Sequence, residues 1–276
     1  MLSDRILFID GEAIVVDKPA GLPVDPPRDG GLSVASHLES LAFGFVRWPT
    51  PVHRLDRDTS GCLLLSRNPK AHARFQKAFE ARGVEKVYWA VVDGVPAEEA
   101  GTVDAALTKV STREAGWRMV VDAKGKDART HWRVLEVRAG KALIEMRPET
   151  GRTHQLRVHA VHGIGMPIVG DAVYGPSTGS GRAGLGGSGG PSTRSGQGML
   201  LHARSLRVAR GDKAAVEAVA PVPLAFSAAG FLAAGWGEEP LPAAAAQRPP
   251  FPASGEGLMS AHPLDLPSFP AGGEGQ

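Results

Sequence analysis

The sequence predicts an α+β fold: a largely antiparallel, mixed central sheet with a few flanking helices. Short segments rich in valine, isoleucine, leucine and aromatic residues recur along the chain, as expected for strands. A hairpin turn joins two of them, and helical periodicity is found in only a few places. A regular alternation of strands and helices would instead indicate a parallel sheet.

Five segments are typical of strands, and their composition changes sharply at each end. They are residues 13–19, 61–67, 86–95, 130–137 and 141–147. The last two flank Arg138-Ala139-Gly140, a sequence typical of a hairpin turn. We therefore expect these two strands to pair antiparallel.

Residues 68–83 predict the clearest helix. Asn68 suits the N-cap, Pro69 the first turn and Gly83 the C-terminal end. Its apolar residues recur at helical spacing and form one stripe: Ala71, Phe75, Ala78 and Phe79. Residues 33–44 predict a second, weaker helix of the same kind.

Composition indicates a soluble globular protein. The chain has 276 residues, of which 42% are hydrophobic and 22% are charged, which is enough to bury a sizeable core. Cys62 is the single cysteine, so neither an internal disulfide nor a cysteine zinc cluster can form. The first twelve residues lack the basic flank and apolar core of a signal peptide, and no stretch approaches a membrane span. We expect a cytoplasmic location and no membrane partner.

Low-complexity segments divide the chain. We predict one folded domain over residues 1–237, with a flexible Gly/Ser-rich surface loop at 175–198 and a disordered Pro/Ala/Gly-rich tail at 238–276. The tail holds five acidic residues and one basic residue, so the preceding 237 residues carry a net charge of +6. A basic folded part suits a polyanionic partner such as a nucleic acid.

Two dense polar segments stand beside predicted strands. The first, PVHRLDRDTSGCLLL at 51–65, places five charged or titratable side chains directly before a buried strand. The second, at 147–163, predicts a strand end, a turn at Thr150-Gly151 and a short helix capped by Thr153 and ended by Gly163. If the two segments meet, an aspartate from one and an arginine from the other would form a pair that keeps the carboxylate ionised.

Other interpretations of the first segment remain open at this point. Asp56 and Asp58 resemble the paired aspartates of a metal-dependent phosphohydrolase, although the apolar strand follows them rather than precedes them. His-Arg-x-Asp is also found in kinase catalytic loops, but no Gly-rich phosphate loop precedes it. A metal site that adds His53 has no supporting His-x-x-x-His pattern with an acidic base.

Residues 53–61 (HRLDRDTSG) and 148–159 (PETGRTHQLRVH) closely resemble the two signature segments of the RluA-like family of RNA pseudouridine synthases. Further segments are similar to the family in the same order, so the resemblance spans roughly residues 6–230. They are 14–26, 86–94, 167–175 and 200–206. The resemblance implies the pseudouridine synthase fold with a catalytic cleft.

The resemblance also implies a reaction, the isomerisation of uridine within RNA to pseudouridine without a cofactor or metal. By position in the motifs, Asp56 is the catalytic aspartate, Arg152 its ionic partner, and Tyr88 the side chain against the uracil ring. An ionised carboxylate in a dry pocket needs a fixed cation, and a flipped base needs a flat surface. An inactive RNA-binding protein on the same fold is the alternative, but it would need none of these three residues.

Six neighbouring residues are predicted to complete the substrate-binding site. They are His53, Arg54, Thr59, His154, Gln155 and Arg157. Within the first segment, Arg54 is expected to fill the gap left by a flipped uridine, while His53 and Thr59 orient the loop by hydrogen bonds. The RNA partner is expected to be ribosomal or transfer RNA, read at a stem-loop uridine by a monomer. Asp25 departs from the family pattern, which often has histidine there.

Overall fold

The computed structural model describes residues 1–112, 116–175 and 198–231. The predicted loop at 175–198 lies outside these residues except for its two end glycines, and the predicted tail at 238–276 lies wholly outside them. The proposed domain boundary at residue 237 therefore stays a prediction.

Within the described residues, ten strands form one mixed sheet and two more form a separate hairpin. The ten are β1 (Ile6–Ile9), β2 (Ala13–Lys18), β3 (Thr50–Pro51), β4 (Ser60–Ser66), β5 (Val84–Val92), β6 (Ala100–Asp104), β9 (Arg129–Arg138), β10 (Lys141–Pro148), β11 (Leu201–Arg210) and β12 (Lys213–Val219). The hairpin consists of β7 (Leu107–Thr112) and β8 (Gly116–Val121). The helices are α1 (Pro69–Glu80), α2 (Gln155–His162) and α3 (Leu224–Ala228), with three short 3₁₀ segments, η1 (Leu2–Arg5), η2 (Val34–His37) and η3 (Glu39–Leu41).

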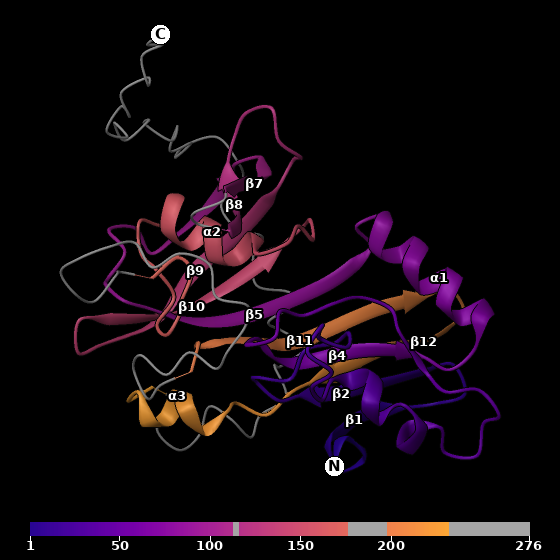
Figure 1. Ribbon diagram of the computed structural model, residues 1–276. Coiled ribbons are helices and arrows are strands. Elements are labelled where there is room, and N and C mark those ends of the chain that lie inside the picture. The colour runs from indigo at the N-terminus through magenta and orange to yellow at the C-terminus, as the bar shows by residue number, and fades with distance from the viewer. Residues whose placement is uncertain (113–115, 176–197, 232–276) are drawn as a thin grey trace, which may run out of the picture.

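The strand order along the sheet is β1-β2-β4-β11-β5-β10-β9-β6, with β3 beside β4 and β12 beside β11. Among the described strands, β4 and β11 form a parallel pair, and the other pairs are antiparallel. The predicted α+β class with a mostly antiparallel sheet is confirmed. β5 runs through the middle of the molecule, between the part of the sheet near α1 and the part near α2 (Figure 1).

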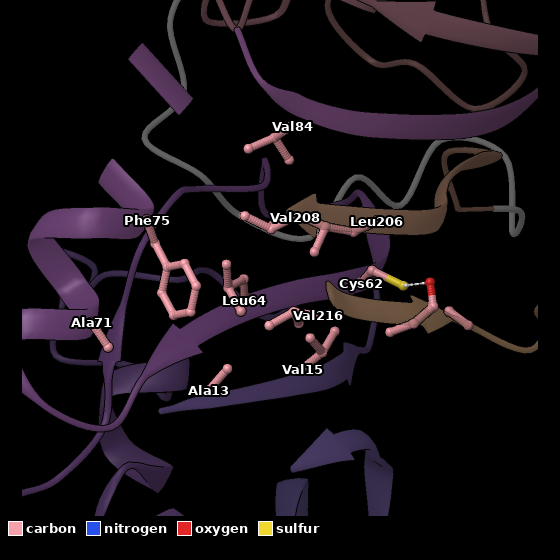
Figure 2. Packing of buried hydrophobic residues seen from close by; sticks show 12 residues of the cluster. Ala13, Val15, Cys62, Leu64, Ala71, Phe75, Val84, Leu206, Val208 and Val216 are labelled. Carbon is pink, nitrogen blue, oxygen red and sulfur yellow. Dashed lines mark hydrogen bonds between the residues drawn. The ribbon is translucent and has the colours of Figure 1, made fainter. Parts of the chain in front are cut away.

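Both faces of β2 and β4 are covered, which explains their uninterrupted apolar sequences. All thirteen residues of the two strands are buried. On one face, Val15 and Leu64 pack with Phe75 of α1 (Figure 2). On the other face, Val16 and Leu63 pack with residues of η2 and η3. A strand buried on both faces reads as a continuous hydrophobic run.

Helix α1 begins where the sequence predicts. The Asn68 side chain accepts a hydrogen bond from the Ala71 backbone N–H at 2.8 Å, which satisfies one free donor of the first turn. The weaker helix predicted at 33–44 is wrong, because this segment forms the two 3₁₀ turns η2 and η3 instead. Short 3₁₀ turns suffice to bring Val34 and Leu41 into the core against β2 and β4.

A second part of the core lies under α2. Leu156 and Ala160 of this helix pack on β5, β9 and β10, while α3 covers the opposite face with Phe226. Tyr88 of β5 packs against the cluster under α2 and against the one under η2 and η3. The junction of these two clusters is where the polar segments meet. No helix among the described residues is long and apolar enough to cross a membrane.

Candidate active site

Asp56 lies in the loop between β3 and β4, and this loop is fixed from several sides. Leu55 is buried in the core, and the Thr59 backbone N–H donates to the Asp56 carbonyl at 3.1 Å. The fully buried Lys18 donates from Nζ to three carbonyls, those of Pro19, Leu22 and Arg57, at 2.7–2.9 Å. The Asp56 side chain remains 28% exposed, so its carboxylate is held in place yet open to a ligand.

Arg157 links Asp56 to a second carboxylate. Its Nη1 donates to Asp56 Oδ2 at 3.3 Å, while Nε and Nη2 make a bidentate pair with Asp171, both bonds at 2.7 Å. Burial acts against the charge of Arg157, but the hydrogen bonds and charge of Asp171 outweigh it, so the pKa of Arg157 is raised. Burial would likewise raise the pKa of Asp171, but Arg157 lowers it. Arg157 and Asp171 are therefore both charged at neutral pH.

His154 stands on the other side of Asp56. Its Nε2 lies 3.8 Å from Asp56 Oδ2, and its Nδ1 is 3.0 Å from the Tyr174 hydroxyl. That hydroxyl accepts a bond from the Met119 N–H at 3.0 Å, which leaves its own proton for Nδ1 and favours the tautomer with the proton on Nε2. Burial lowers the pKa of His154, partly offset by the Asp56 charge, so the ring is neutral near pH 7.

Tyr88 is placed by the sheet. It pairs with Met146 of β10 on one side and Ala203 of β11 on the other. Burial, and then the negative charge of Asp56, raise the pKa of its phenol, which stays protonated at neutral pH. The phenol is thus close enough to Asp56 to be affected by its charge, and the predicted place of Tyr88 against the uracil ring stays a prediction.

The arginine that pairs with Asp56 was predicted incorrectly. Arg152 directs its Nε to the Asp127 carbonyl at 2.9 Å, and Arg157, predicted as an RNA contact, takes the place beside Asp56. The predicted cap is also wrong: His154, not Thr153, is the N-cap of α2, in a left-handed conformation with φ 53°. The turn at His154 decides which arginine faces the carboxylate.

Gln155 does not have the role predicted for it. Its Nε2 donates to the Arg129 carbonyl and to the Thr130 hydroxyl, both at 3.0 Å. Its Oε1 accepts from the Thr150 hydroxyl at 2.7 Å and the Arg152 N–H at 3.0 Å. Since an amide side chain has two donors and two acceptor positions, none remains for RNA.

Two further residues of the first segment differ in their exposure: His53 packs against the protein and Arg54 faces solvent. His53 accepts a hydrogen bond from the Leu64 N–H at 3.0 Å and stacks on Phe79, and burial lowers its pKa to about 3. It therefore orients the loop as a neutral acceptor. Arg54 points outward, 77% exposed, and forms an ion pair of 2.9 Å with Asp25.

Sequence reasoning missed four residues around Asp56. Asp171 and Tyr174 lie in the segment GDAVYG, which was matched to the family as a whole without a role for either side chain. Lys18 lies in another matched segment. Trp117 of β8, whose ring packs at a tilt against that of His154, had no signal in the sequence. In the sequence, the signal that could have pointed to Asp171 is an acidic residue that closely follows an apolar run.

No metal cluster supports the phosphohydrolase alternative. Within residues 1–112, 116–175 and 198–231, no group of three or more His, Cys, Asp and Glu side chains is arranged to hold a metal ion. Asp56 is instead neighboured by an arginine and a histidine.

Comparison with known proteins assigns the family. A family model described as RNA pseudouridylate synthase matches residues 12–162. An uncharacterized RNA pseudouridine synthase of Zymomonas mobilis is 52% identical over 84% of this chain and 99% of its own length. The ribosomal large subunit pseudouridine synthase D of the same organism is 40% identical over 63% of this chain, which spans 56% of that relative.

Solved structures of two human pseudouridylate synthase domain proteins are similar to this chain. The human RNA pseudouridylate synthase domain containing 4 protein aligns with a TM-score of 0.66 and 30% identity, covering 82% of this chain and 91% of its own. The human domain containing 1 protein aligns with a TM-score of 0.62, also at 30% identity, covering 81% and 85%. With its fold and its sequence match in agreement, the chain belongs to the RNA pseudouridine synthase family of isomerases.

Proposed function

We propose that Asp56 and Arg157 form the catalytic pair with which this enzyme converts uridine in RNA to pseudouridine. The observation that carries the proposal is the ion pair between the two, anchored from behind by Asp171. A carboxylate acts as a nucleophile or base only when ionised, and a fixed guanidinium keeps it so in a partly buried site.

The reaction is an isomerisation and its atoms balance without a co-reactant. The bond between ribose C1′ and uracil N1 breaks, the uracil turns, and C1′ bonds to C5. The proton on C5 leaves, and N1 gains a proton. Asp56 acts on the nucleoside as nucleophile or as base; both roles place its Oδ1 and Oδ2 against the ribose or the uracil.

Tyr88 supplies the surface against which the uracil lies. Its phenol is protonated, because burial and the Asp56 charge raise its pKa. A protonated phenol is a poor acceptor for the C5 proton, so the ring face, rather than the hydroxyl as a base, carries the role that we assign to Tyr88.

Arg54 is proposed to fill the gap left when the uridine leaves its stack. Its partner Asp25 is itself half exposed. Exposed ion pairs of this kind contribute at most about 1 kcal/mol to stability, so RNA can displace Asp25 from Arg54. Arg54→Ala is expected to slow the reaction on folded RNA and to leave it unchanged on an unstructured RNA containing the same uridine. Equal rates of the variant and wild type on folded RNA would exclude this role.

Ribosomal RNA is the proposed substrate, because one of the relatives already described is named for the large ribosomal subunit and is 40% identical over 63% of this chain. Transfer RNA is the second substrate to be tested. We further propose a stem-loop uridine as the target, and a monomer in the cytoplasm as the acting species.

The test is tritium release from RNA labelled at uridine C5, on unmodified ribosomal and transfer RNA transcripts, with a chelator present throughout. We expect release by the wild type and none by Asp56→Asn. Arg157→Lys and Arg152→Lys separate the two arginines: the first is expected to lose nearly all activity and the second to lose little. Full activity of Arg157→Lys together with an inactive Arg152→Lys would overturn the assigned pair.

A further inference from the structure

The hairpin of β7 and β8 lies over α2 (Figure 1), and its Trp117 contacts His154, which in turn neighbours Asp56. In its register, Leu107 faces Val121, Lys109 faces Met119, and Ser111 faces Trp117. Cross-strand partners and every second residue share a face, so Leu107, Met119 and Trp117 lie on the same side of the hairpin.

This side of the hairpin faces the protein. Leu107 is buried together with Val158 of α2, and Met119 and Val121 pack against that cluster. Met119 is half-buried, and its backbone N–H is bonded to Tyr174. Leu107, Met119 and Val121 thus make the contact with α2, and Trp117 is not needed for it.

Trp117 continues the same side beyond the beginning of α2. Its ring centroid is 5.0 Å from that of His154, the N-cap residue, and the residue is still 47% exposed. His154 Nε2 in turn lies 3.8 Å from Asp56. A large indole surface is therefore open to solvent one side chain away from the catalytic carboxylate.

A basic side chain accompanies the exposed indole. Lys109 Nζ lies 5.0 Å from the ring centroid, and Lys109 is exposed. A flat aromatic surface beside basic groups is the combination with which proteins bind unpaired nucleic acid, since bases stack on the ring and phosphates meet the cations.

We propose that Trp117 forms a second nucleotide subsite, in which the base next to the target uridine stacks on the indole and Lys109 turns to its phosphate. The inference rests on the proposed placement of the uridine over Asp56. Stacking on Trp117 holds the flanking strand while the uridine is out of its stack. The subsite binds RNA and takes no part in the bond changes.

Substitutions at Trp117 distinguish stacking from packing against His154. On the ribosomal RNA transcripts, Trp117→Ala is expected to raise KM about tenfold with little change in kcat, because one stack contributes on that scale. Trp117→Phe keeps a ring and is expected to stay near wild type. Trp117→Leu restores apolar contact with His154 without a ring, and is expected to be as weak as the alanine variant.

A loss confined to kcat, or full recovery by Trp117→Leu, would show that the indole only positions His154 and would overturn the subsite.

Tryptophan fluorescence provides a second readout that needs no turnover. Titration of the protein with the same RNA is expected to quench wild-type emission, and Trp117→Phe to abolish most of the quenching. Trp48→Phe is the matched control, because Trp48 is also exposed but precedes β3, whose Thr50 pairs with Ser66. Ser66 is at the far end of β4 from Asp56, about 20 Å away at strand spacing.

The outcomes separate the two proposals. Quenching that persists in Trp117→Phe, or a wild type that binds RNA without quenching, would overturn the subsite. Quenching that depends on Trp117, in a protein that releases no tritium, would support the subsite and overturn the catalytic assignment instead.

Discussion

Replacing Asp171 with asparagine removes the charge that holds Arg157, and thereby Asp56, in place. The Asp171 side chain is almost fully buried and accepts two hydrogen bonds from Arg157 at 2.7 Å. Asparagine can accept at one of these positions, but at the other its amide N–H would face an arginine N–H. Arg157 would then keep Asp56, at 3.3 Å, as its remaining carboxylate.

The size of the effect follows from this geometry. Breaking a buried ion pair by removing one partner costs about 3–5 kcal/mol. Because Arg157 retains Asp56, we expect the lower end, about 3 kcal/mol, which corresponds to a fall in Tm of roughly 6–12 °C for a protein of this size. An Arg157 that is free to shift would also misplace the carboxylate, and a displacement of 1 Å can cost about a hundredfold in rate.

The measurements are the free energy of unfolding in urea, and kcat by tritium release at a temperature where the variant is folded. The control is Asp104→Asn, which breaks the ion pair between Asp104 and Arg129, whose side chains are both about half exposed. That pair is expected to contribute less than about 1 kcal/mol. If Asp171→Asn cost no more than the control and left kcat unchanged, Asp171 would have no part in holding Asp56.

Two further predictions concern the sheet and its dependence on pH. Gly61→Ala is expected to lower the free energy of unfolding by at least about 2 kcal/mol, since φ is +104° and the new Cβ would overlap the Ala203 carbonyl of β11. Gly11→Ala, where a Cβ meets nothing within 4 Å, is the control in the same urea titration. Equal stability of the two variants would contradict the argument. Hydrogen bonds from Arg74 and Lys213 lower the pKa of Glu12 to about 2, so the stability that this carboxylate contributes is complete above its unfolded pKa of about 4.3 and is lost as the pH falls towards 2. Urea midpoints between pH 5 and 2 should therefore fall less in Glu12→Gln than in the wild type, and parallel curves would refute the assignment.

The local sequence was sufficient to predict strands and a helix start that depend on residues close together in the chain. Continuous apolar runs marked β2 and β4, which are buried on both faces, and Asn68 marked the beginning of α1. The charged segment directly before β4 marked the site, and the resemblance of that segment to the pseudouridine synthases singled out Asp56 within it. Two short 3₁₀ turns at 34–41 were read as a helix, because both place apolar residues at similar spacing.

The tertiary structure alone decided which side chains meet Asp56. Arg152 and Arg157 are five residues apart in one polar segment, and nothing in their spacing says which of them faces a loop about a hundred residues earlier. The left-handed turn at His154 and the carboxylate of Asp171 select Arg157. An ion pair between distant segments depends on where the sheet brings their ends, so the sequence determined the candidates for this site and the packing of β5, α2 and the loop before β4 determined the pair.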